Sequence, residues 1–209
     1  CMQNFSDLQL ESLIIFALST FRIWIQSYWE SLNEEIVNNI KFLIFSQAKL
    51  ISIPINSIQA SVQVNLFQRL YPEQWESFWN DLLTLNPDIV LSFLQEFYSV
   101  YQNIDPNITE YMKVDNSELS VIHFIITNIE NGVESALSIL IQMLEWIDPT
   151  PIFQSSIIDF IQTNLSISID YISQCNSEDE IFHENLSKLE CSMKLLNGIV
   201  SSMYIEPSI

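Results

Sequence analysis

The side chains that could carry out chemistry are few in this sequence, and their spacing matches no catalytic or metal-binding motif. The two histidines, His123 and His183, stand apart, and His183-Glu184 lacks the second histidine of the zinc-protease motif HExxH. The three cysteines form no CxxC pair, and no serine stands in a GxSxG turn. We therefore predict that the chain is not an enzyme and that it uses no metal and no cofactor.

One loop comes closer to a metal-binding pattern. Asp105, Asn107 and Thr109 have the spacing of the first oxygen ligands of a calcium-binding loop. Such a loop requires glycine at its sixth position for a sharp turn, and Glu110 stands there. The pattern therefore does not predict a calcium site.

The composition predicts a protein with a large core and a basic partner. Of the 209 residues, 26 are acidic and 7 are basic, which gives a formal net charge of −19, and 48% are hydrophobic. Only 2 residues are glycine, which argues against Rossmann units, P-loop enzymes and other folds that need Gly-rich turns. Because phosphate contacts need clustered Lys and Arg, we do not expect this segment to grip nucleic acid by itself.

The sequence also bears on the compartment. Scattered cysteines without a disulfide framework favour a reducing compartment, the cytosol or the nucleus. The longest uninterrupted apolar run, residues 13–18, is too short to span a membrane, and the start of the chain lacks the pattern of a signal peptide. Because the chain begins with Cys1 instead of methionine, we expect it to be a piece of a longer protein.

Apolar residues recur at helical spacing along nearly the whole chain. A capping-box pattern at residues 31–34 begins the second expected helix, and Pro54 ends it. Pro72 opens the fourth helix, since proline suits the first helical turn. We expect residues 104–116 to form a loop. The nine expected helices have the approximate bounds 7–25, 33–50, 56–70, 73–83, 87–103, 119–129, 133–147, 150–169 and 178–203.

Taken in pairs, these helices repeat about every forty residues, the period of HEAT and armadillo hairpins. The hairpins would span residues 7–51, 55–85, 87–130 and 131–171, followed by one further helix. We predict an all-α fold, a right-handed α-solenoid of antiparallel HEAT-type hairpins that forms a single segment over residues 1–209. The alternative is an irregular all-α globule.

Two further patterns have competing interpretations. An aromatic cluster follows residue 70, with Trp75, Phe78, Trp79, Leu82 and Leu83 at the spacing of the inner face of a helix. Core packing accounts for these side chains. The acidic side chains either form a solvated surface or line a concave strip that receives a basic protein. Several of them fall in first helical turns, where carboxylates stabilise the helix dipole in any case.

The aromatic cluster resembles a known family pattern. Importin-β-type transport receptors, the karyopherins, carry Tyr/Trp-Pro-x-x-Trp-x-x-Phe-hydrophobic-x-Asp-Leu near the N-terminus. The matching residues here are Tyr71, Pro72, Trp75, Phe78, Trp79, Asp81 and Leu82. Shorter stretches resemble one branch of this superfamily, the exportin-T family of tRNA exporters: residues 6–28, 78–87, 93, 104–105 and 145–148. The chain is therefore similar to the N-terminal part of a much longer receptor.

The resemblance implies a function. In such receptors the second helix of each hairpin lies on the concave side, here residues 33–50, 73–83, 118–129 and 150–169, and these helices bind the small GTPase Ran in its GTP form. The implied contacts with Ran-GTP are Glu34, Asn38, Lys41, Glu73, Glu76, Asn80, Asp115 and Glu118. A few tRNA contacts could come from Lys41, Lys49 and Arg69. Ran-GTP and tRNA would each tighten the binding of the other, and GTP hydrolysis would release both.

The resemblance also implies partners and location. We expect a monomer that shuttles between nucleus and cytoplasm, carries tRNA through the full-length receptor, contacts nuclear pore proteins and binds no membrane. Three alternatives stay open: a related receptor with protein cargo, a HEAT-like scaffold or adaptor that does not depend on Ran, and a helical enzyme domain. Binding that depends on the nucleotide state of Ran separates the scaffold from the receptors.

Overall fold

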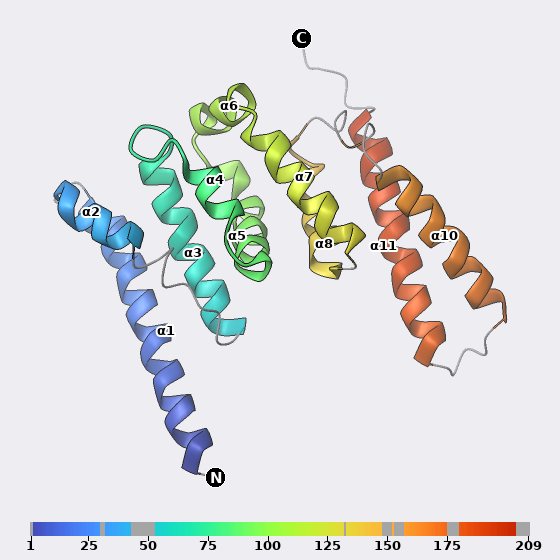
Figure 1. Ribbon diagram of the computed structural model, residues 1–209, viewed down its shortest axis with the longest axis horizontal. Coiled ribbons are helices and arrows are strands. Elements are labelled where there is room, and N and C mark those ends of the chain that lie inside the picture. The colour runs from blue at the N-terminus through green and yellow to red at the C-terminus, as the bar shows by residue number, and fades with distance from the viewer. Residues whose placement is uncertain are drawn as a thin grey trace. The chain divides into compact units, whose positions relative to one another are not determined.

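The computed structural model describes residues 2–29, 32–42, 53–131, 133–147, 152, 157–174 and 180–203 (Figure 1). Every regular element in these ranges is a helix, so the predicted all-α class is confirmed. Among these helices, none is both long enough and apolar enough to cross a membrane. The chain divides into two compact units, Cys1–Asp115 and Asn116–Ile209, which are described separately.

The first unit is built around one central helix. Helix α3 packs against α1 on one side and against α5 on another. Nearly every turn of α3 is therefore buried, including Val62, Leu66 and Phe67. The elements of this unit are α1 (Met2–Tyr28), α2 (Glu34–Lys41), α3 (Ile53–Leu70), α4 (Phe78–Leu83), α5 (Pro87–Ser99), the 3₁₀ turn η3 (Tyr101–Asn103) and α6 (Pro106–Val114).

An aromatic core fills the space between α3, α4 and α5. Phe67 lies at its centre, fully buried, with Phe78 at 4.7 Å and Trp79 at 5.2 Å between ring centroids. Phe93 and Phe97 of α5 meet the same ring edge-on, at 6.1 and 5.4 Å. Edge-to-face pairs of this kind add stabilisation beyond the burial of apolar area. The core prediction for Phe78 and Trp79 is thus confirmed.

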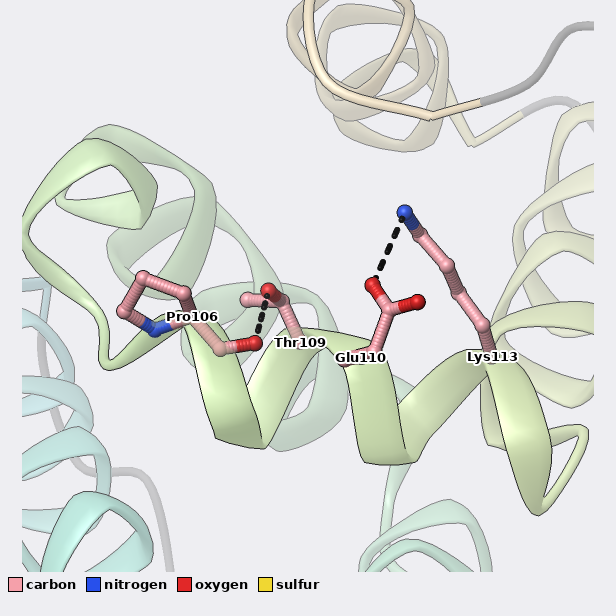
Figure 2. Close-up of polar contacts among 4 residues, drawn as sticks. All are labelled: Pro106, Thr109, Glu110 and Lys113. Carbon is pink, nitrogen blue, oxygen red and sulfur yellow. Dashed lines mark hydrogen bonds and ion pairs between the residues drawn. The ribbon is translucent and has the colours of Figure 1, made fainter.

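The predicted loop over residues 104–116 is wrong, because α6 occupies most of it. The Asp105 side chain accepts a hydrogen bond from the Asn107 amide, and Pro106 takes the first helical turn, which together start the helix. Ile108 and Met112, four residues apart, are buried on one face of α6. The outer face of α6 is polar. Figure 2 shows polar and charged side chains there that form a hydrogen bond and an ion pair within the helix.

Two predicted helix ends near proline also differ from the structure. The third helix was expected to begin at about residue 56, but α3 begins at Ile53 with Pro54 in its first turn, where the missing N–H costs no hydrogen bond. The fourth helix was expected to open at Pro72, but residues 71–77 form turns and α4 begins only at Phe78. The capping residue of α2 is Asn33, which accepts from the Ile36 amide. The predicted continuation of that helix over 43–50 lies outside the described residues.

The described residues of the second unit form the helices α7 (Ser117–Glu130), α8 (Glu134–Met143), α10 (Ile157–Gln174) and α11 (Glu180–Met203). Helix α7 packs on α8, and α11 packs on both α8 and α10. The predicted bounds of α7 and α11 are close to those observed, whereas α8 ends at Met143, before the predicted 147. Gly198 sits at the α8–α11 contact, where a Cβ would lie 3.2 Å from the Leu144 side chain.

Candidate protein-binding surface

Six of the eight residues expected to contact Ran line two adjoining surface depressions of the first unit. The first depression, of about 510 Å³, is lined by Trp29, Leu32, Glu34, Val37, Asn38, Lys41, Glu73 and Gln74. The second, of about 600 Å³, is lined by Lys41, Gln74, Trp75, Glu76, Ser77 and Asn80. Because Lys41 and Gln74 belong to both linings, we call the two depressions together the Lys41 groove.

Helix α2 supplies one wall of the groove through its helical period. Val37 and Ile40 are buried and anchor the helix. Glu34, Asn38 and Lys41 follow at i, i+4 and i+7, so they share one face, and this face lines the groove together with Val37. The turns at residues 71–77 supply the opposite wall.

Lys41 joins the two walls. Its Nζ donates a hydrogen bond of 2.7 Å to the backbone carbonyl of Gln74 and lies 5.0 Å from the centre of the Trp75 ring. The distance to the ring is within the range of a cation–π contact. Burial lowers the pKa of Lys41 below its ordinary value, and the carboxylates of Glu34 and Asp81 act against this by raising it. The groove therefore holds a partly desolvated ammonium group.

Trp75 lies at the surface, not on the inner face where the helical spacing placed it. Its ring is half-buried and meets Phe78 edge-on at 5.2 Å. Its Nε1 donates to the Asp81 carboxylate at 2.7 Å, and the Ser77 hydroxyl donates to the same oxygen at 2.8 Å. Asp81 thus fixes the orientation of the ring that faces Lys41. Leu83, another expected inner-face residue, is also only half-buried.

The remaining expected contact residues do not line the groove. The Asp115 carboxylate accepts a hydrogen bond from the hydroxyl of Tyr71, whose ring is buried in the aromatic core. Glu118 belongs to the second unit, in the first turn of α7. Arg69 is exposed at the end of α3, and Lys49 lies outside the described residues. Six lining residues were not among the expected contacts, since nothing in their local pattern marks a contact: Trp29, Leu32, Val37, Gln74, Trp75 and Ser77.

The Lys41 pKa gives a direct check on this geometry. We expect Glu34→Gln to lower the pKa of Lys41 further, because the carboxylate that raises it is removed. Folding lowers this pKa below 10.5, so the unfolded chain holds the proton more tightly than the folded chain. The contribution of Lys41 to the free energy of unfolding therefore rises with pH between the folded-state pKa and 10.5. An NMR titration of the labelled Lys41 side chain measures the pKa. An unchanged value in Glu34→Gln, as expected for the control Glu110→Gln, would contradict the placement.

Comparisons with protein-family models, with curated proteins and with solved structures give no match. The described residues contain no group of three or more His, Cys, Asp and Glu side chains placed to hold a metal ion. The groove is instead lined by carboxylates, amides and aromatic rings. Such a lining can bind the basic side chains of another protein by ion pairing, hydrogen bonding and cation–π contact.

Proposed function

We propose that this chain is the N-terminal Ran-GTP-binding part of a nuclear export receptor of the importin-β type, with tRNA as the cargo of the full-length protein. The observation that carries the proposal is the Lys41 groove. It gathers six residues that the family resemblance implies as contacts: Glu34, Asn38, Lys41, Glu73, Glu76 and Asn80. The formal charge of −19 suits a partner with a basic surface.

The packing of the first unit supports a HEAT-type arrangement in this proposal. In a stack of hairpins, the first helices of successive hairpins lie against one another. Helices α1, α3 and α5 would be these first helices, and α3 packs against both of the others. Helices α2 and α4 would then be the second, concave helices. The Lys41 groove is formed by α2 together with the turns that lead into α4.

The role of this chain would be binding and not catalysis. Ran-GTP would stabilise a wrapped conformation of the receptor that also binds tRNA, so that each partner raises the affinity for the other. The acidic charge of this segment would leave most phosphate contacts to other parts of the receptor. Hydrolysis of GTP on Ran would then release both partners in the cytoplasm.

The experiment is a calorimetric titration of the chain with Ran loaded with a non-hydrolysable GTP analogue, with GDP-loaded Ran as the control. The proposal requires binding that is selective for the GTP form. Equal binding of the two forms would favour a scaffold that does not depend on the nucleotide state. If neither form binds this chain or the full-length protein, the receptor function is rejected.

A further inference from the structure

We propose that the Lys41 ammonium group occupies a cation site of the groove, which an arginine or lysine side chain of the bound partner takes over. Lys41 would then act as an internal substitute for the partner's side chain and would move aside on binding. This inference rests on the proposed role of the groove in binding a basic partner. It does not require that the partner be a GTPase.

The surroundings of the Lys41 ammonium form a cation site. The Gln74 carbonyl accepts a hydrogen bond from it at 2.7 Å, and the face of the Trp75 ring lies 5.0 Å away. A carbonyl oxygen and an indole face are two groups that attract a cation. The ring cannot turn away freely, because Asp81 holds its Nε1. The geometry would serve a guanidinium group equally well, since guanidinium also stacks on aromatic rings.

Another cation can replace the Lys41 ammonium group at this site. The lysine is half-buried, and burial disfavours its charged form, as the direction of its pKa change also indicates. Its four-carbon stem is flexible, so the ammonium group can leave the Trp75 face and regain water without unwinding α2. The Glu34 carboxylate on the same helix face offers it an alternative partner nearby.

The two depressions explain why the displacing group would belong to a longer basic segment. They meet at Lys41, with Glu34 and Glu73 in the first lining and Glu76 in the second. A segment crossing both depressions would meet carboxylates on either side of the cation site. Successive basic side chains could therefore pair with Glu73 and Glu76 while one of them takes the Trp75 face.

The test uses a fluorescein-labelled peptide of alternating glycine and arginine, with fluorescence anisotropy at low ionic strength as the readout. We expect Lys41→Met to bind the peptide about 5–10-fold more tightly than the unchanged chain, because methionine keeps the apolar stem but no longer competes for the site. The matched control is Lys113→Met. Lys113 is exposed on α6, 3.7 Å from Glu110, and removing it changes the net charge equally (Figure 2). We expect the control to alter the affinity less than about twofold.

Equal or weaker peptide binding by Lys41→Met would overturn the inference, and so would an equal gain in Lys113→Met. A second measurement covers the case in which Lys41→Met does not fold. In the unchanged chain, saturating peptide should shift the NMR signals of the Lys41 side chain and the Trp75 indole N–H, whereas a peptide with neutral citrulline for arginine should not. NMR signals that do not shift when the arginine peptide is added would also overturn the inference. The peptide assay contains no GTPase, so its result does not depend on Ran. If Lys41→Met binds the peptide more tightly but the chain does not bind Ran, the proposed function is rejected and the inference about the cation site stands.

Discussion

We expect Phe67→Ala to lower the free energy of unfolding of the first unit by about 3–5 kcal/mol, the range for removing a buried aromatic ring from a core. Phe67 is 0% exposed, and its ring contacts aromatic rings from α4 and α5 as well as Tyr71. Removing it would leave a cavity at the place where α3, α4 and α5 meet. The turns at residues 71–77, which carry one wall of the Lys41 groove, depend on the same packing.

Urea unfolding, followed by tryptophan fluorescence and circular dichroism, measures this effect. The matched control is Phe16→Ala on α1, where the ring is 68% exposed and the expected change is below about 0.5 kcal/mol. A loss of less than about 1 kcal/mol in Phe67→Ala would show that this ring does not organise the core. A large loss in both variants would contradict the assignment of Phe16 to the surface of α1.

The second large effect concerns binding. If the groove receives Ran-GTP, we expect Glu73→Lys combined with Glu76→Lys to weaken the complex about tenfold or more at low ionic strength, because two attractive contacts become repulsive. The two carboxylates lie in different depressions on either side of Lys41. Both are exposed and lie in the turns before α4, outside the regular helices.

The control for this prediction is Glu110→Lys combined with Glu145→Lys. Both residues are exposed, neither is in the described lining of the groove, and the change of net charge is the same. Titration calorimetry with Ran bound to a GTP analogue compares the two double variants. An equal loss of affinity in both would mean that only the overall negative charge matters. An unchanged dissociation constant in the groove variant would reject the groove as the contact surface.

The helical class and most helix positions follow directly from the apolar spacing, because a stripe at i, i+3 and i+4 must be buried whatever the partner helix is. Helices α7 and α11 agree closely with the expected bounds. Helix α6, which occupies most of the predicted loop over 104–116, was missed although its signals were present. Asp105-Pro106 is the same start pattern as Asn86-Pro87, and Ile108 and Met112 have helical spacing. In this segment the short length and the polar residues outweighed both signals.

The position of Trp75 shows why the groove could be predicted only in part. Trp75 and Trp79 would share a buried face if the helix began at Pro72, but the helix begins at Phe78, and Trp75 therefore stays in the turn. The faces of α2 could be read from the sequence because a helix fixes them. The contact of Lys41 with the Gln74 carbonyl could not be predicted from the sequence, since every residue has a backbone carbonyl and none is marked as an acceptor by its type. Trp29 reaches the groove from the end of α1, which no local pattern indicates.

Binding of Ran-GTP in the Lys41 groove is tested most directly by hydrogen–deuterium exchange of this chain alone, with Ran-GTP and with Ran-GDP. We expect Ran-GTP to protect the amides of residues 32–42 and 71–80, which carry most of the groove lining, and Ran-GDP at the same concentration not to protect them. Protection by both nucleotide forms, protection confined to other segments, or no protection by a saturating amount of Ran-GTP would contradict the proposal that the Lys41 groove binds the GTP form of Ran.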